Sequence, residues 1–166
     1  MKGQSEILIF VLLFIISIAL FTAATIWSKN IFQQNVDVAK VENSEKFAKE
    51  LNEAILNVIK FGGSQEIRYN IEGTIELLND NTIEIKVPIS LPLSEQWVNI
   101  SSDTSFIRER KEGDYFKIQI NYTNNQYKVE FFTEGPKLAT PSYIVIENNE
   151  TYFSTVTVIK IKITFI

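Results

Sequence analysis

The sequence contains no cysteine and no histidine. The missing thiols and imidazoles exclude disulfides, zinc sites built on these ligands, and Cys–His or Ser–His catalytic pairs. An excess of positive charge is also missing, because 16 Lys and Arg residues stand against 20 Asp and Glu residues and the net charge is −4. A chain of this charge has no electrostatic footprint for nucleic acid. We therefore expect no nucleic-acid partner.

Carboxylates are the only strong acid–base groups that are present in number. Asp80, Asp103 and Asp114 fall in predicted turns, where aspartates usually make local hydrogen bonds. The stretch Asn79-Asp80-Asn81 lacks the spacing and the further ligands of a calcium loop. We expect no catalytic residue, no metal site and no cofactor, and we do not expect an enzyme.

What the sequence does have is one long apolar run. Ile7 to Trp27 is 21 residues without a charge, and its polar members are only Ser17, Thr22 and Thr25. A helix of this length spans about 31 Å, close to the thickness of the bilayer hydrocarbon. Trp27 and Lys29 close the run as an interfacial aromatic and a cation would. The run predicts a membrane anchor, with Ile7, Phe10, Leu13, Ile16, Leu20 and Trp27 among its residues.

Two other interpretations of the run remain open. A secretory signal peptide would be cut after Ala24, where Thr22-Ala23-Ala24 offers small residues. Glu6 beside the single Lys2 and the length of the run count against this. A buried core helix is the second alternative, although such a helix is rarely apolar on every side for so long.

The residues before the run carry a family resemblance. Lys2-Gly3-Gln4-Ser5-Glu6 followed by a long apolar segment resembles the amino terminus of archaeal type IV pilin-like proteins with a class III signal peptide. The resemblance implies that a prepilin peptidase cuts between Gly3 and Gln4, so that residues 1–3 are a leader and the helix stays in the mature protein. It also implies assembly with other pilin-like subunits.

Glu6 is the residue that the resemblance would assign to assembly. In the family the acid usually stands at the fifth mature position, whereas Glu6 would be third. A carboxylate at this place also has a simpler explanation, because the helix dipole favours it and water can solvate it next to a membrane helix. Both interpretations stay open.

A second helical pattern follows the anchor, which we place at residues 4–28. Residues 29–63 predict an amphipathic helix or stalk, which Gly62-Gly63 ends, and Asn43-Ser44 offers a cap at which a separate helix would begin. Its apolar stripe, which we expect to pack on the sheet that follows, consists of Phe47, Ala48, Leu51, Ala54, Ile55, Val58 and Ile59.

From residue 64 to residue 166 the pattern changes to alternation, which predicts seven to nine short strands in an antiparallel β-sandwich-like domain. Polar turns at residues 79–81, 123–126 and 148–150 predict three hairpins. In the last strand, Ile159, Ile161, Ile163 and Phe165 share one face, and a phase slip at Val158-Ile159 predicts a bulge or a change of packing partner. The fold class is therefore α+β, a membrane helix and an amphipathic helix followed by this domain.

Three N-x-S/T sequons begin at Asn99, Asn121 and Asn149, about the number that chance predicts for this composition. They become glycan sites if the domain lies outside the cell. Two functions follow as expectations. The chain is a single-pass, pilin-like subunit of the cell surface with its β-domain outside, anchored in the lipid membrane before it enters a filament. Alternatively, it never polymerises, and its β-domain binds an envelope partner of the S-layer or archaellum-stator type.

Overall fold

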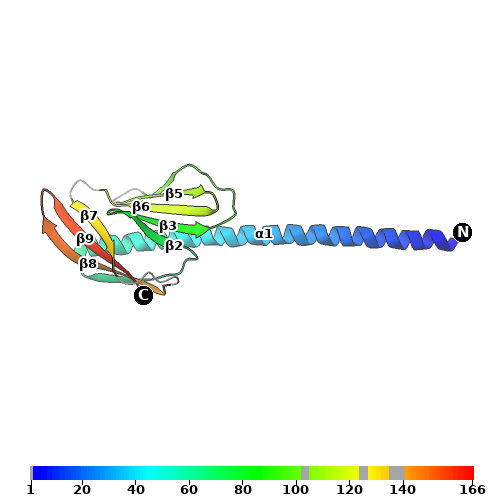
Figure 1. Ribbon diagram of the computed structural model, residues 1–166, viewed down its shortest axis with the longest axis horizontal. Helices are drawn as coiled ribbons and strands as arrows, with labels where there is room; N and C mark the ends of the chain where they lie inside the picture. The colour runs from blue at the N-terminus through cyan, green and yellow to red at the C-terminus, as the bar shows by residue number, and fades with distance from the viewer. Residues whose placement is uncertain (1, 102–104, 124–126, 135–140) are drawn as a thin grey trace. The chain divides into compact units, whose positions relative to one another are not determined.

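The computed structural model describes residues 2–101, 105–123, 127–134 and 141–166. The chain forms two compact units, Met1–Asp37 and Val38–Ile166. A single helix, α1 (Lys2–Phe61), contributes residues to both units, and the strands of the described chain all lie in the second (Figure 1).

α1 is one uninterrupted helix of 60 residues. Residues 29–63 are therefore not a separate amphipathic helix, and the alternative of a break at Asn43-Ser44 is wrong. No proline or glycine lies between Gln4 and Phe61, and the hydroxyl of Ser44 donates to the Val41 carbonyl at 2.8 Å instead of capping a new helix. The predicted end is confirmed, because Gly62 and Gly63 have φ values of 69° and 78°, which glycine adopts without a steric penalty.

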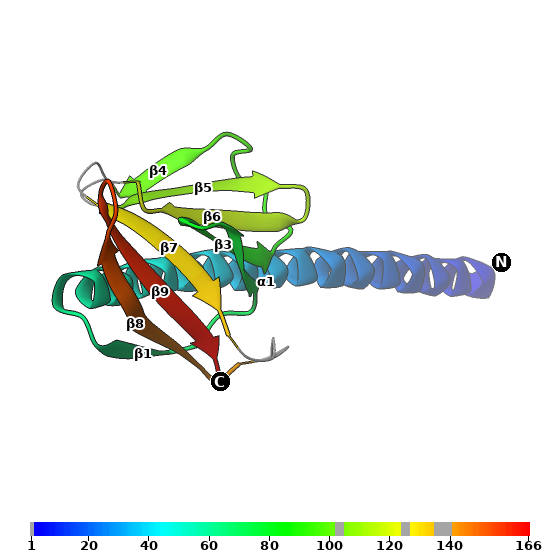
Figure 2. The same cartoon turned by 60° about the vertical axis from the view of Figure 1, so that its left-hand side comes forward.

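The strands form two sheets, a four-stranded one in the order β1-β8-β9-β7 and a five-stranded one in the order β2-β3-β6-β5-β4. Their bounds are β1 (Ser64–Arg68), β2 (Thr74–Asn79), β3 (Thr82–Pro88), β4 (Val98–Ser101), β5 (Phe106–Glu112), β6 (Tyr115–Asn121), β7 (Tyr127–Thr133), β8 (Tyr143–Phe153) and β9 (Thr157–Phe165). Figure 2 shows both sheets next to the carboxy-terminal part of α1.

One hydrophobic core extends through the second unit. It contains the helical stripe, whose members from Phe47 to Val58 are buried while Ile59 is partly buried. The inner faces of both sheets contribute to the same core, for example Ile85 and Ile118 from the five-stranded sheet and Ile146 from the four-stranded one. The expectation that the stripe packs on the sheets is confirmed.

Strand pairing departs from the prediction in two places. β6 and β7 do not pair as a hairpin, because β6 pairs with β3 and β5 whereas β7 pairs with β9 in the other sheet. One isolated antiparallel bridge, Thr123 to Lys128, joins the two ends of the predicted turn. The β7–β9 pair is also parallel, which makes the four-stranded sheet mixed, whereas the other strand pairs of the described chain are antiparallel as predicted. The β2–β3 hairpin is confirmed.

The last hairpin turns later than predicted. β8 continues through residues 148–150 to Phe153, and its register with β9 shifts between Asn148 and Glu150. The irregularity therefore lies on β8, opposite Lys160 and Ile161, while the pairing of β9 with β7 is continuous. Ile159, Ile161 and Ile163 are buried and Phe165 is partly buried in the core, so the domain itself covers this row.

Candidate functional site

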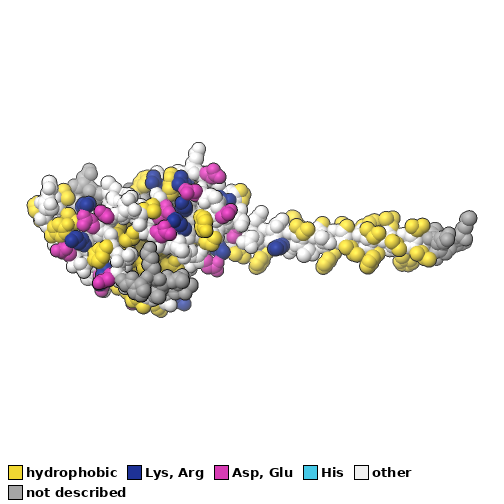
Figure 3. Space-filling view, in the orientation of Figure 1, with side chains coloured by type: hydrophobic (Ala, Val, Ile, Leu, Met, Phe, Trp, Pro, Cys, Tyr) yellow, Lys and Arg dark blue, Asp and Glu magenta, His cyan; other side chains and the backbone are white. Residues whose placement is uncertain are grey.

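The apolar segment Ile7–Trp27 exposes all of its side chains. Its three hydroxyls do not interrupt the apolar surface, because Ser17, Thr22 and Thr25 each donate to the carbonyl four residues earlier at 2.8 Å. The polar groups of the segment are thereby satisfied within the helix, as a hydrocarbon environment requires. Figure 3 shows hydrophobic side chains along the visible face of this part of α1.

Within the described chain, one helix is long and apolar enough to span a membrane or to act as a signal sequence, with a mean hydropathy of 3.0 in its most apolar window. The predicted anchor residues, Ile7, Phe10, Leu13, Ile16, Leu20 and Trp27, are all exposed on it. Ala24, at which a signal peptidase would cut, lies in the middle of α1 with no break on either side.

The predicted processing site lies at the start of the same helix. The backbone of Gly3, Gln4 and Glu6 is helical. The side chains of residues 2–6 lie outside the described part of the structure. The cleavage between Gly3 and Gln4 and the role of Glu6 therefore stay predictions.

The three sequons have different surroundings. Asn99 on β4 and Asn149 on β8 are exposed. Asn121, at the end of β6, is partly buried, and its amide nitrogen donates to the Thr82 hydroxyl at 2.8 Å while its oxygen accepts a short hydrogen bond from Thr123. Of the three sequon asparagines, Asn99 and Asn149 are thus accessible for glycosylation.

The turn aspartates are not brought together into a site. Asp80 lies in the β2–β3 turn and Asp114 in the β5–β6 turn, and both are exposed. Asp103 lies outside the described residues. In the described part of the chain, no group of three or more Asp, Glu, His or Cys side chains could hold a metal ion.

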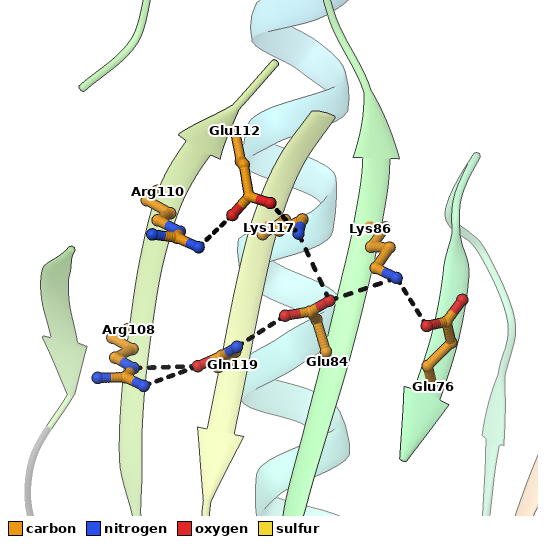
Figure 4. A network of polar contacts seen from close by, with 8 residues as sticks. All are labelled: Glu76, Glu84, Lys86, Arg108, Arg110, Glu112, Lys117 and Gln119. Carbon is orange, nitrogen blue, oxygen red and sulfur yellow. Dashed lines mark hydrogen bonds and ion pairs between the residues drawn. The ribbon is translucent and has the colours of Figure 1, made fainter. Parts of the chain in front are cut away.

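The main polar constellation covers the face of the five-stranded sheet that points away from α1 (Figure 4). Side chains from β2, β3, β5 and β6 form a connected network of Glu76, Glu84, Lys86, Arg108, Arg110, Glu112, Lys117 and Gln119. The same face appears as a band of basic and acidic side chains over the β-domain in Figure 3.

Glu84 is the centre of this network, and its side chain is only 5% exposed. It accepts a hydrogen bond from the Gln119 amide at 2.7 Å. Its other oxygen lies 3.5 Å from the Lys86 ammonium and 3.9 Å from the Lys117 ammonium. A buried carboxylate needs such partners, because burial without them is costly.

Exposed carboxylates complete the network at its two ends. Glu76 accepts from Lys86 at 2.6 Å, and this hydrogen bond raises the pKa of Lys86 above its usual value. Glu112 accepts from Lys117 at 2.8 Å and forms a short ion pair with Arg110. The hydrogen bond from Lys117 lowers the pKa of Glu112. Both shifted groups therefore stay charged at neutral pH.

Trp97, just before β4, packs against the arginines of this face. The guanidinium carbons of Arg108 and Arg110 lie 4.4 and 4.5 Å from the centre of its ring. These are cation–π distances, and the contact restricts both long side chains. The indole and the two guanidiniums therefore pack together at one side of the network.

Two further polar groups lie on the inner side of the domain. The Tyr122 hydroxyl, one residue beyond the end of β6, donates to Asn52 Oδ1 of α1 at 2.8 Å within the core. Glu109 points toward α1, where burial raises its pKa to about 7, with a further increase from Glu45 and an opposing effect of Lys49. Its Oε2 atom is buried and has no hydrogen-bond partner in the described structure.

The sequence interpretation missed the polar network. A usable signal was present, because charged or amide residues alternate with isoleucines in β3 and β6, as in Glu84-Ile85-Lys86 and Lys117-Ile118-Gln119. Such alternation places them on one face of each strand. What it does not reveal is the pairing order, which puts β3, β6 and β5 side by side.

Comparison with known proteins gave no match among family models, curated proteins or solved structures. The architecture of the chain is therefore classified from its fold alone. A long, apolar amino-terminal helix followed by β-sheets is a pilin-like architecture.

Proposed function

We propose that this chain is a pilin-like subunit of the cell surface, anchored in the membrane by residues 7–27 and displaying residues 64–166 outside. The observation that carries the proposal is the continuity of α1. The apolar segment and the stripe that fills the β-domain core belong to one helix without a break. Removal of a signal sequence after Ala24 would cut within this helix, whereas a permanent anchor keeps it whole.

Processing is the second part of the proposal. The resemblance of Lys2-Gly3-Gln4-Ser5-Glu6 to a class III signal peptide supports cleavage between Gly3 and Gln4 by a prepilin peptidase. Cleavage there removes three residues and keeps the whole apolar segment. Glu6 would then lie near the new amino terminus, where it could pair with a neighbouring subunit during assembly.

The first experiment is mass spectrometry of the amino terminus of the protein made in a host with a prepilin peptidase. We expect a mature chain that begins at Gln4, and we expect Gly3→Leu to leave the leader in place. Ala24→Leu is the matched control, since it tests the other cleavage site and should change nothing. A chain that begins at Thr25, or that keeps Met1 in the unaltered protein, contradicts the proposal.

The second experiment separates assembly from simple anchoring. Cells are sheared and the released filaments are collected and probed for the chain. Recovery in filaments, and its loss in Glu6→Gln, supports the pilin-like subunit. A correctly processed chain that stays in the membrane fraction instead supports the alternative, a single-pass protein whose β-domain binds an envelope partner.

A further inference from the structure

Asn149, the accessible sequon asparagine of the four-stranded sheet, is the extra residue of a β-bulge on β8. The register of β8 with β9 shifts between Asn148 and Glu150, so Asn149 between them has no cross-strand partner. A bulge re-aims the side chain that it carries. The Asn149 side chain is exposed, and within the described structure it makes no hydrogen bond. Its amide is therefore free to carry a modification.

Asn149 also lines a hollow of about 390 Å³, a size within the range of small-molecule sites. The other residues that line this hollow are Asp80, Glu130, Phe131, Phe132 and Lys160. They come from β7, from β9 and from the β2–β3 turn, and Figure 2 shows β8, β9 and β7 side by side. The hollow thus extends from Asn149 across three neighbouring strands to the turn that holds Asp80, which belongs to the other sheet.

The charged groups of the hollow differ in whether they already have a partner. Lys160 is ion-paired with Glu150 at 2.9 Å, and Glu130 is ion-paired with Lys128 at 2.6 Å. The Asp80 carboxylate is exposed, and among the described residues it has neither a hydrogen bond nor an ion pair. The hollow therefore offers one unengaged acceptor opposite the asparagine.

We propose that this hollow holds the first sugars of a glycan attached to Asn149. Sugar hydroxyls can donate to the Asp80 carboxylate, which is an acceptor. The apolar C–H face of a sugar can cover the partly exposed ring of Phe132. Covalent attachment compensates for the small number of contacts, because a short tether gives a ligand a high effective concentration. The seated glycan would join β8 of one sheet to the β2–β3 turn of the other.

The inference rests on the proposed function in one respect, since glycosylation requires the domain to lie outside the cell. Asn99 is the internal reference, because it is exposed on β4 of the five-stranded sheet and does not line this hollow. A glycan on Asn99 reports where the domain lies. A difference between the glycans of Asn99 and Asn149 reports whether the hollow holds one of them.

The experiment uses the full chain made in a yeast that adds high-mannose glycans, purified in non-ionic detergent. Endoglycosidase H cuts between the first two sugars, and peptide mass spectrometry follows the cut at each asparagine. In the folded protein we expect cleavage at Asn149 to be about tenfold slower than at Asn99, which corresponds to about 1.4 kcal/mol of seating free energy. After denaturation the two rates should be equal.

Two variants test the contacts of the seat. Phe132→Ala removes the ring and Asp80→Ala removes the free carboxylate, and each should bring the rate at Asn149 closer to the rate at Asn99. Phe61→Ala is the matched control, because it removes a ring that is 81% exposed and does not line the hollow. It should leave both rates unchanged. Near-ultraviolet circular dichroism verifies that each variant is folded.

Three results would overturn the inference and leave the proposed function standing. They are equal cleavage rates at both asparagines of the folded protein, a slow rate at Asn149 that persists in both Phe132→Ala and Asp80→Ala, and a glycan on Asn99 with none on Asn149. Glycans on neither asparagine would contradict the outside position of the domain, and would overturn the inference together with the proposed function.

Discussion

At the scale of single residues, Glu109 makes a specific prediction about pH. Its pKa of about 7 lies above the ordinary value of 4.5, so the folded domain binds more protons than the unfolded chain between these values. Stability therefore falls as pH rises through this interval. We expect the β-domain to unfold at a lower temperature at pH 8 than at pH 5, and Glu109→Gln to reduce this difference.

The measurement is thermal unfolding of the full chain in detergent at several pH values. Near-ultraviolet circular dichroism monitors the unfolding. Glu112→Gln is the control, because the pKa of Glu112 is lowered and its loss should not flatten the decline between pH 5 and pH 8. If the unaltered protein and Glu109→Gln show the same pH dependence, Glu109 is not the group responsible.

The sequons give a second prediction at this scale. Asn99 and Asn149 are exposed, whereas both polar atoms of the Asn121 side chain are held by threonines. In a host that glycosylates extracellular sequons, we expect peptide mass spectrometry to find glycans at Asn99 and Asn149 and an unmodified Asn121. Substantial modification of Asn121 would show that the sequon is recognised before β6 and β3 have paired.

At the scale of elements, one buried hydrogen bond links α1 to the five-stranded sheet. Tyr122→Phe removes the donor and leaves Asn52 Oδ1 buried without its partner. Such a loss costs about 1–3 kcal/mol. Tyr115→Phe removes a hydroxyl from an exposed position and should cost less than about 0.5 kcal/mol. Denaturant unfolding compares the free energies of unfolding of the two variants. Equal losses of stability would show that the Asn52–Tyr122 hydrogen bond does not stabilise the domain.

Strand β9 supports a further prediction about the same core. It lies between β8 and β7, and Ile161 is fully buried while Ile166 beyond its end is largely exposed. We expect Ile161→Ala to destabilise the domain by about 2–5 kcal/mol. Ile166→Ala should have an effect within about 0.5 kcal/mol. A mild effect of Ile161→Ala would mean that the row is completed by a second subunit instead.

Some of these elements could be predicted from the sequence alone and others could not. The long apolar run, the helical stripe from Phe47 to Ile59 and the β2–β3 hairpin follow from local periodicity and turn residues, and the structure has all of them. The β7–β9 pair does not follow, because a parallel pair joins segments that no short turn connects. The hairpin turn predicted at residues 123–126 lies, except for Thr123, outside the described residues, and β6 and β7 on its two sides belong to different sheets.

The same limit applies to the polar face. The alternation is visible in β3 and β6, but Trp97, Arg110 and Lys117 come together only through the order β4-β5-β6. On β5 the alternation is hidden, because the inner position 109 is a glutamate among four other charged residues from Arg108 to Glu112. Burial of this carboxylate against α1 is a tertiary effect that local patterns do not encode.

At the scale of the whole molecule, the division into Met1–Asp37 and Val38–Ile166 predicts which pieces fold. The alternation of residues 64–166 and the helical stripe, taken as separate patterns, leave it open whether the strands fold into a domain without the stripe. The core requires the stripe, because Phe47, Leu51 and Ile55 are at most 1% exposed and belong to the same cluster as both sheets.

Two fragments test this requirement. A fragment of residues 38–166 keeps the stripe and loses the apolar segment, so we expect a soluble monomer with strand-rich circular dichroism and a cooperative thermal transition.

A fragment of residues 65–166 loses the three large side chains of the stripe, each of which contributes about 1.5–3 kcal/mol when buried. That loss is comparable to the entire stability of a small domain, about 5–15 kcal/mol, and it also uncovers the inner faces of both sheets. We therefore expect the shorter fragment to aggregate or to show no cooperative transition. Cooperative folding of residues 65–166 would mean that the helix is an accessory to the sheets, and failure of residues 38–166 would mean that the first unit is needed for the second to fold.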